Sequence, residues 1–521
     1  MKRLLPLLLC VVASATTAPA AEMRFAAVFC DHVVLQRDLP LPVWGWGDPG
    51  ESVTVEFAGQ RKTAKADDAG KWRVTLDPLA ASAEPRTLVA RGAKPDRACQ
   101  AADVLVGEVW LGSGQSNMAM TVNRAKDFEK EKAASGLPLI RMFREESGAA
   151  GEGQADAKGK WSVCSGDTVG SFSATLFFFG RHLHRELKIP VGLINSSVGG
   201  TPIESWIAAD AQARLPQLKA LLDEAARADA AFDEAQAKAR YEKALAQWKD
   251  KATQAKKAGQ TTPQKPRDPL EARRRRGGPG GLFNGKIAPL IPFALRGAVW
   301  YQGEANSHPG KGALYRYQLP LLVSDWRDRW GREMPFAWVQ LPNFQRPGEG
   351  WLLVQEAQLK ALRLPATGMA ITIDIGDAKD IHPKNKQDVG LRLAMWALGE
   401  VYGRKDVATS GPLPAGCEVK GSQVVLSFTH ADGGLVARGG ELKGFEIAGE
   451  DRQWAPAQAR IEGDKVVVSN PQVEKPAAVR YAWKTVPDCN LANARGLPAS
   501  PFRTDDWPVP DAPLPAKEKK P

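Results

Sequence analysis

The middle of the chain, residues 102–410, alternates short apolar runs with amphipathic stretches, and this alternation limits the fold more than any other feature. The apolar runs have strand length, while the stretches between them have helical spacing. Strand-like runs occupy residues 104–111, 189–195, 295–301, 336–341 and 369–375, and residues 171–187 form the clearest helical stretch. Strands that alternate with helices build parallel sheets covered on both faces. The sequence therefore predicts an α/β domain over residues 102–410.

Residues 21–101 and 411–507 have a different pattern, with short β-type runs separated by Gly, Pro and Asp clusters. Several short strands at such spacing are typical of small sandwiches. We expect two flanking β modules. The first shows no obvious chemistry, and it is either a packing module, which is the first choice, or a carbohydrate-binding module. The final residues, 508–521, are rich in Pro and Lys and are predicted to be disordered.

An insertion at residues 207–280 interrupts the middle domain. Its leucines recur at helical spacing, and residues 261–281 are rich in Pro, Arg and Gly. We expect a helical hairpin followed by a flexible return, with Arg273–Arg276 in a solvated loop; a polybasic docking site is the alternative. The insertion holds 16 basic and 10 acidic residues, so it supplies +6 of the net charge of +11. The basic balance is therefore local, and without a binding motif it predicts no nucleic-acid partner.

The N-terminus has the features of a secretory signal peptide. Two basic residues precede a short apolar run at residues 4–12, and Ala18-Pro19-Ala20 gives a cleavage pattern before Ala21. We expect residues 1–20 to be removed on export to a periplasm or the medium. No later stretch is apolar enough for stable membrane insertion. Five cysteines follow the signal without a C-x-x-C pair, so no metal or redox motif is indicated, and Cys417 with Cys489 is the candidate disulfide.

The turn after the run 104–111 contains the first candidate functional residue, Ser116. Small residues at 112–114 allow a sharp turn, which places Ser116 near a helix N-terminus, where a backbone N–H and the local dipole favour a developing oxyanion. The turn is not a G-x-S-x-G elbow, because Met118 occupies the last glycine position. Ser116 is therefore either a nucleophile or a helix N-cap.

A nucleophilic serine needs a general base, and the chain has only six histidines: His32, His182, His184, His308, His382 and His430. His382 is the best placed, because it follows the run 369–375 and precedes Pro383, which suits the first turn of a helix. His308 also follows a strand end and stays a candidate. A carboxylate must orient the imidazole; Asp380 is the first choice and Asp377 the reserve.

Two further turns fit an oxyanion site. Residues 195–201 include two glycines whose N–H groups can approach a substrate oxygen closely. Residues 300–306 include Gln302 and Asn306, either of which can supply a side-chain donor, and Glu304, which can order the loop.

Together these four turns resemble those of the SGNH (GDSL-like) hydrolase superfamily and, within it, the sialate O-acetylesterase branch of carbohydrate esterases. The matching motifs are residues 114–118, 198–201, 300–304 and 380–383. The resemblance implies a three-layer, flavodoxin-like catalytic domain and a metal-free, cofactor-free acyl-enzyme mechanism. It implies Ser116 as nucleophile, His382 as base, and oxyanion donors from the Ser116 and Gly200 backbones and a third-turn side chain.

One position departs from the superfamily pattern. The usual last motif is Asp-x-x-His, but Lys379 stands where the aspartate is expected. The acid is therefore open between Asp380 and Asp377, and a Ser–His dyad is the third option.

The predicted function is hydrolysis of O-acetyl esters on a carbohydrate, with sialate or another acetylated glycan as substrate. Two rivals stand beside it. A non-catalytic glycan-binding protein with a hydrolase-like core would keep its sugar affinity without Ser116. An esterase for longer acyl chains would differ in its chain-length preference.

Overall fold

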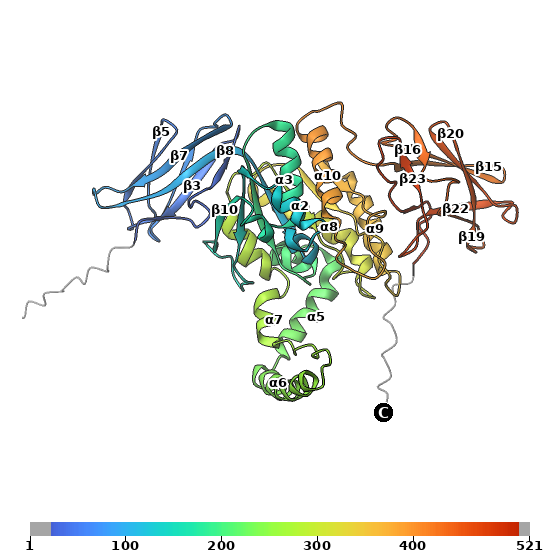
Figure 1. Cartoon of the computed structure of the whole chain (residues 1–521), viewed down its shortest axis with the longest axis horizontal. Helices are drawn as coiled ribbons and strands as arrows, with labels where there is room; N and C mark the ends of the chain where they lie inside the picture. Colours follow the sequence, from blue (N-terminus) through green and yellow to red (C-terminus); the bar gives the residue numbers. More distant parts are fainter. Residues whose placement is uncertain (1–21, 510–521) are drawn as a thin grey trace, which may run out of the picture.

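The structure, a computed structural model, describes residues 22–509. The predicted signal peptide at 1–20 and residues 510–521 of the predicted tail lie outside the described residues. Figure 1 shows β-structure at both ends of the described chain, with a mixed sheet and its helices between them. The described chain is therefore a mixed α/β protein.

The central sheet has the strand order β10-β9-β11-β8-β12-β13-β14. Its neighbours from β9 to β14 are parallel, and β10 runs antiparallel to β9, so the expected parallel sheet is confirmed. The strands are β8 (Ala98–Gly114), β9 (Leu137–Glu145), β10 (Gly159–Cys164), β11 (Val191–Ser197), β12 (Gly297–Tyr301), β13 (Phe336–Val339) and β14 (Thr367–Ala370).

The order of five of these strands locates the crevice where a site is expected. Taken by their place in the chain, β11, β8, β12, β13 and β14 lie in the order 2-1-3-4-5 of a doubly wound sheet. In such sheets ligands bind beyond the carboxyl ends of the strands, where the order reverses. Here that point lies between β8 and β12.

Strand β8, 17 residues long, joins the N-terminal strands to the central sheet. Its first part pairs with β7 and β2, and its second part pairs with β11 and β12. The N-terminal strands are β1 (Arg24–Phe25), β2 (Val34–Gln36), β3 (Leu41–Trp46), β4 (Ser52–Phe57), β5 (Gln60–Lys65), β6 (Lys71–Leu76) and β7 (Ser82–Arg91).

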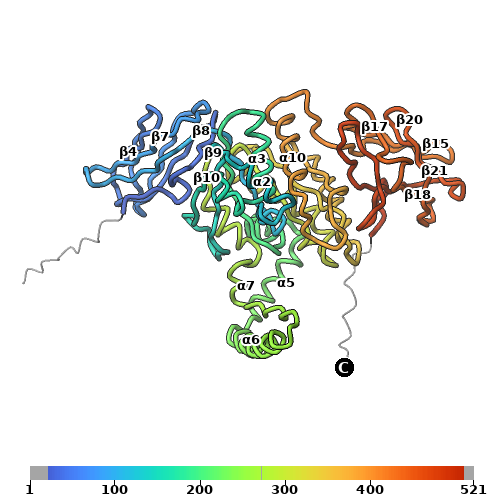
Figure 2. The backbone as a smooth tube through the Cα atoms, viewed as in Figure 1, coloured from blue at the N-terminus to red at the C-terminus, as the bar shows by residue number. Residues whose placement is uncertain are grey.

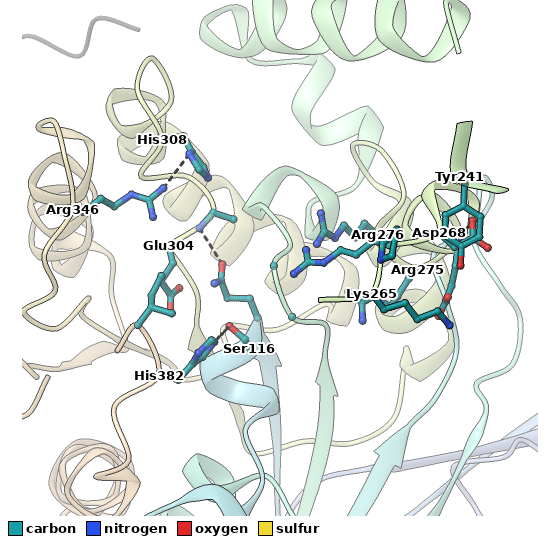
Figure 3. Close-up of a pocket in the computed structure, with 18 residues that line it drawn as sticks. Ser116, Tyr241, Lys265, Asp268, Arg275, Arg276, Glu304, His308, Arg346 and His382 are labelled. Carbon is teal, nitrogen blue, oxygen red and sulfur yellow. Dashed lines mark hydrogen bonds between the residues drawn. The ribbon is translucent and has the colours of Figure 1, made fainter. Parts of the chain in front are cut away.

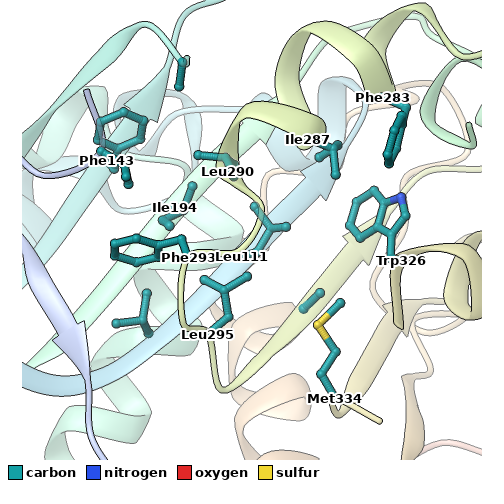
Figure 4. Packing of buried hydrophobic residues seen from close by; sticks show 14 of the residues in the cluster. Leu111, Phe143, Ile194, Phe283, Ile287, Leu290, Phe293, Leu295, Trp326 and Met334 are labelled. Atoms are coloured by element: carbon teal, nitrogen blue, oxygen red, sulfur yellow. The ribbon is translucent and has the colours of Figure 1, made fainter. Parts of the chain in front are cut away.

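Helices pack on both faces of the central sheet because successive strand residues point to opposite sides. On β12, Val299 belongs to the apolar cluster of α3 (Ala174–Leu187) and α10 (Lys386–Trp396). Trp300 belongs to the cluster of α8 (Tyr315–Trp330) and α9 (Gly350–Lys360). Figure 4 shows this second cluster, where Leu111 and Ile194 of the strands pack beside Leu290 and Phe293.

Capping residues explain where two helices begin. Helix α3 begins at Ala174 because the Ser173 side chain accepts from the N–H of Leu176. Helix α10 begins at Lys386 rather than at Pro383, because Asn385 caps it by accepting from the N–H of Asp388. The expectation of Pro383 in the first turn was therefore wrong by about one turn, and His382 lies in the loop before the helix.

The insertion forms an arm, which we define as residues 219–276. It consists of α5 (Lys219–Ala230), α6 (Glu234–Lys257) and α7 (Pro269–Arg276), and α6 packs against α7. Figure 2 shows the arm projecting from the central part, with α6 at its far end. The expected solvated loop at Arg273–Arg276 is corrected: these residues end α7, which Asp268 caps by accepting from the N–H groups of Leu270 and Glu271.

The C-terminal strands form three small sheets. They are β15 (Leu413–Lys420), β16 (Gln423–Thr429), β17 (Leu435–Ala437), β18 (Phe445–Gly449), β19 (Ala455–Pro456), β20 (Gln458–Glu462), β21 (Lys465–Ser469), β22 (Pro476–Tyr481), β23 (Leu491–Asn493) and β24 (Phe502–Arg503). The remaining α-helices are α1 (Ser116–Ala119), α2 (Phe128–Ala133) and α4 (Ala209–Ala213). The domain boundaries at 101/102 and 410/411 stay predictions.

Two further sequence expectations concern membranes and cysteines. Within residues 22–509, no helix combines the length and apolar character needed to cross a bilayer. All five cysteines in this part of the chain are free, so Cys417 and Cys489 form no disulfide in the structure.

A buried carboxylate links the N-terminal strands to the sheet. Glu108 of β8 is 0% exposed. It accepts from the guanidinium groups of Arg37, at 2.5 Å, and Arg296, at 2.7 and 3.0 Å, and from the Gln36 amide at 3.1 Å. Arg37 follows β2 and Arg296 precedes β12, so the one carboxylate joins three segments.

Replacing this carboxylate tests its structural role. We expect Glu108→Ala to lower the unfolding free energy by about 3–5 kcal/mol, because it removes the buried partner of two guanidinium groups and leaves them only the exposed carboxylate of Asp38, at 3.5 and 4.0 Å. Urea denaturation followed by circular dichroism measures the loss. Glu84→Ala, which removes an exposed ion pair with Arg86, is the control and should change stability by about 1 kcal/mol or less. Equal effects of the two variants would refute the link.

Candidate active site

The turn that carries Ser116 leaves β8 at the carboxyl end of the sheet. Gly114 has a φ of 132°, and a Cβ there would lie 2.2 Å from the Tyr301 carbonyl oxygen, so only glycine fits. The N–H of Gln115 donates to that carbonyl at 3.0 Å. Ser116 then begins α1, beside the end of β12, at the reversal point of the strand order.

Ser116 and His382 meet although 266 residues separate them in the chain. The Ser116 Oγ and the His382 Nε2 lie 2.8 Å apart, which is hydrogen-bond distance. Figure 3 shows the two side chains pointing toward each other at the base of the pocket. This is the geometry in which an imidazole can take a proton from a serine hydroxyl.

Of the two candidate acids, only Asp380 lies near the imidazole. Its Oδ1 is 3.8 Å from the His382 Nδ1, longer than a hydrogen bond, and it accepts from the His382 N–H at 2.9 Å. The Asp377 carboxylate instead accepts from the N–H groups of Lys379 and Asp380, at 2.8 and 3.2 Å. Asp377 therefore shapes the loop.

The surroundings of His382 favour its neutral form. Burial lowers the pKa of the imidazole below its ordinary value; the carboxylate of Asp380 opposes this shift, and the positive charges of Lys386 and Arg124 add to it. A neutral imidazole has a free lone pair on Nε2 and can accept the Ser116 proton.

A buried network beneath the pair holds their two loops together. The Asn117 amide donates to the Glu304 Oε1 at 2.5 Å and to the Ile381 carbonyl at 2.9 Å. The Lys386 ammonium donates to the Asn117 Oδ1 at 2.8 Å and to the Pro383 carbonyl at 2.6 Å. Asn117, the residue after Ser116, is thus bonded to both ends of the loop that contains His382.

Two buried charges belong to this network. Lys386 is 0% exposed, and burial lowers the pKa of its ammonium to about 7, although Glu304 and Asp380 favour the charged form. Burial raises the pKa of Glu304, against the Asn117 hydrogen bond and the charges of Lys386 and Arg346. Among the described residues, none bonds to the buried Oε2 of Glu304.

The two glycines of the second turn lie beside the serine. A Cβ at Gly199 would be 3.4 Å from the Ser116 Cβ, and Gly200 has a φ of 71°, which favours glycine. Within the described part of the chain, no group accepts a hydrogen bond from the N–H of Ser116 or Gly200. Both glycines line the pocket, which leaves such donors available to a ligand.

Gln302 and Asn306 lie beneath the pocket and do not line it. The Gln302 amide donates to the Thr201 carbonyl at 3.1 Å and to the Asn306 Oδ1 at 2.6 Å, and the Asn306 amide donates to Glu204 at 2.9 Å. Both side chains are 0% exposed. The expectation that either side chain faces the oxyanion is corrected: their donors are used in joining the second and third turns.

The pocket around Ser116 has a volume of about 760 Å³. The sheet side of its lining includes Gln115, Ser116, Glu304 and His382, and the loop residues His308 and Arg346 also face it. The arm contributes Tyr241, the basic residues Lys265, Arg267, Arg275 and Arg276, and the acidic residues Asp268 and Glu271. His308, one of the predicted residues, lines this pocket but does not contact Ser116. Its Nδ1 lies 3.0 Å from a terminal guanidinium nitrogen of Arg346.

Sequence reasoning missed Asn117, Lys386 and Arg276. Asn117 lies inside the motif that identified Ser116, and Lys386 lies four residues after His382, so proximity in the chain was the available signal. Nothing local distinguished Arg276 from the three arginines before it.

In residues 22–509, no three His, Cys, Asp or Glu side chains converge so that they could hold an ion. The absence of cofactor and metal stays a prediction.

A serine bonded to a histidine at the carboxyl edge of a parallel sheet places the chain among α/β proteins with a hydrolase-type site. Comparisons narrow this class. Residues 286–398 match the family model for carbohydrate esterase, sialic acid-specific acetylesterase. The sialate O-acetylesterase of Mus musculus is 28% identical over 95% of this chain and 97% of its own length. That of Homo sapiens is also 28% identical, over 96% of this chain and 95% of its own length.

A solved structure gives the same result. The carbohydrate acetylesterase from Xanthomonas citri is 35% identical, with a TM-score of 0.78, over 93% of this chain and 100% of that one. The chain belongs to the sialate O-acetylesterase family of carbohydrate esterases, and its enzyme class is that of the carboxylic ester hydrolases.

Titration of His382 tests the electrostatics of the site. We expect Asp380→Asn to lower the pKa of His382 further, because Asp380 is the neighbour that favours the imidazolium. Asp377→Asn is the matched control and should leave the midpoint nearly unchanged. The titration of the imidazole Cε1–H by NMR gives both midpoints, assigned by comparison with His382→Ala. A rise in Asp380→Asn would contradict this account.

Proposed function

We propose that this protein hydrolyses O-acetyl esters of carbohydrates, sialate or another acetylated glycan, with Ser116 as nucleophile. The observation that carries the proposal is the 2.8 Å approach of the Ser116 Oγ to the His382 Nε2 in the wall of an open pocket. The names of the related acetylesterases support the acetyl group and the carbohydrate.

The proposed first step follows from the contact between the Ser116 Oγ and the His382 Nε2. The neutral His382 takes the Ser116 proton on Nε2 as Oγ attacks the acetyl carbonyl carbon. The N–H groups of Ser116 and Gly200 stabilise the negative oxygen of the tetrahedral intermediate. The imidazolium then gives its proton to the departing sugar oxygen, which leaves an acetyl group on Oγ.

The second step repeats the sequence with water. His382 takes a proton from the water, the hydroxide attacks the acetyl carbon, and the Ser116 oxygen leaves with the proton that His382 returns. Acetate is released and the hydroxyl is regenerated. Asp380 is the candidate acid that stabilises the imidazolium, and it must move closer to the ring to form a hydrogen bond.

Two finer proposals accompany this function. We infer a three-layer SGNH-type arrangement with flanking β-sandwich modules, supported by the 2-1-3-4-5 strand order and by helices on both faces. We also infer export to a periplasm or the medium, supported by the signal-peptide pattern of residues 1–20.

Acetate release tests the nucleophile and the base. On an aryl acetate and a panel of acetylated sugars, we expect Ser116→Ala and His382→Ala to lower kcat on the order of 10⁴-fold or more, because each removes an obligatory part of the mechanism. Sugar binding by the variants, measured by calorimetry, is the control for folding. A wild type that binds sugars but cleaves no ester would favour the non-catalytic glycan-binding protein. Faster hydrolysis of esters with longer acyl chains would favour the long-chain esterase.

The identity of the acid has its own test. We expect Asp380→Asn to lower kcat by between about 10-fold and 10⁴-fold, the larger figure being that of a buried triad acid. Asp377→Asn should retain most of the activity, because its carboxylate is used in the loop. Initial rates of the two variants on an aryl acetate decide which aspartate is the acid. Full activity in Asp380→Asn would indicate a Ser–His dyad, and a loss confined to Asp377→Asn would reverse the assignment.

A further inference from the structure

The loop that contains His382 is held at two places. We call residues 371–385, which join β14 to α10, the histidine loop. Near its end, the Pro383 carbonyl accepts from the buried Lys386 ammonium, in the network beneath the Ser116–His382 pair. Near its start, Asp374 is bonded to side chains that do not line the pocket around Ser116. The position of His382 therefore depends on contacts outside the site as well as within it.

The contacts of Asp374 come from two parts of the fold. Arg392 of α10 donates to its two carboxylate oxygens at 2.6 and 2.9 Å, a two-pronged bond that fixes direction as well as distance. Arg438, from the C-terminal strands, donates to the Asp374 Oδ2 at 3.1 Å. Burial raises the pKa of the Asp374 carboxyl, but the two guanidinium groups outweigh it and lower this pKa below its ordinary value.

Arg438 reaches the histidine loop from a backbone that is itself bonded. It follows β17, and its N–H donates to the Asn490 carbonyl at 3.0 Å, while its own carbonyl accepts from the Asn490 amide at 3.0 Å. Its second terminal nitrogen donates to the Gly496 carbonyl at 2.9 Å. The guanidinium thus joins the C-terminal strands to the start of the histidine loop through Asp374.

A second link runs through the loop after β13. The Thr485 carbonyl of the C-terminal segment accepts from the Phe344 N–H at 2.8 Å. The neighbouring Asn343 Oδ1 accepts from the N–H of Gly376, two residues after Asp374, at 2.9 Å. The C-terminal segment therefore contacts the histidine loop directly at one point and through an intermediate loop at another.

We propose that Arg438 is a positioning residue for ester cleavage: by binding Asp374, it lets the C-terminal strands hold the histidine loop where His382 reaches Ser116. This inference rests on the proposed function of that pair. Among the described residues, none from the C-terminal strands lines the pocket around Ser116. These strands therefore act on the reaction through the loop and not through contact with the substrate.

Steady-state kinetics on an aryl acetate tests the proposal. We expect Arg438→Gln to lower kcat by about 10- to 100-fold, because a displacement of about 1 Å between reacting groups costs that much, and to leave KM nearly unchanged. Arg438→Lys should lie between this variant and wild type, because an ammonium keeps the charge but loses the planar fork. Arg460→Gln, which removes an exposed ion pair with Glu462 in β20, is the matched control and should keep the wild-type kcat.

A double variant tests whether Arg438 acts through Asp374. Asp374→Asn should lower kcat at least as much as Arg438→Gln, because it also removes the partner of Arg392. Adding Arg438→Gln to Asp374→Asn should then change kcat little, since the two residues act as one pair. Effects that multiply would show that Arg438 acts by another route and would overturn the proposal.

Hydrogen–deuterium exchange gives a measurement that does not depend on activity. Arg438→Gln should speed exchange in the peptide that covers residues 371–385 and leave α3 unchanged, whereas Arg460→Gln should alter neither. Unchanged exchange, an unchanged kcat or an equal loss in Arg460→Gln would overturn the proposal. Should Arg438→Gln not fold, Arg438→Lys decides by the same two measurements. If wild type cleaved no acetyl ester, the proposed function would fail, and exchange alone would decide whether Arg438 holds the loop.

Discussion

The buried ammonium of Lys386 is the interaction on which the geometry of the site depends. Ser116 and His382 lie in two loops that leave different strands, β8 and β14, and nothing in the sheet itself sets the distance between the loops. Lys386 bonds to Asn117 in the first loop and to the Pro383 carbonyl in the second. Through Asn117 it is also connected to Glu304 of the third turn. A charge with no exposed surface needs these partners, so any displacement of the histidine loop carries a desolvation cost.

The sequence identified Ser116 and His382 because one rule governs both: each follows a strand of a parallel sheet, and the carboxyl ends of such strands share an edge. That rule states which loops meet but not which way their side chains point. Gln302 and Asn306 follow β12 as expected, yet both turn inward, because the second and third turns need their amides as a bridge. For the same reason the sequence alone could not decide whether Asp380 or Asp377 lies near the imidazole, because a loop carboxylate can face a ring or its own backbone.

The arm shows where local patterns stop being informative. Helical spacing predicted helices in the insertion, and the structure contains them, but four consecutive arginines have no periodicity that says which one faces inward. Their directions follow from how the end of α7 is anchored, through residues far away in the chain such as Ala149 and Glu204. Those contacts place Arg276 against Gly200 and leave Arg274 exposed. The specific position of a charged residue is thus a property of tertiary contacts, whereas its presence on a helix is a property of sequence.

The charges around His382 also constrain each other. Burial, together with the charges of Lys386 and Arg124, lowers the pKa of the imidazole and so favours its neutral form. The same surroundings oppose the imidazolium that the proposed mechanism requires. Asp380 offsets this opposition only in part, because its carboxylate stands 3.8 Å from Nδ1 and half of it is exposed to solvent.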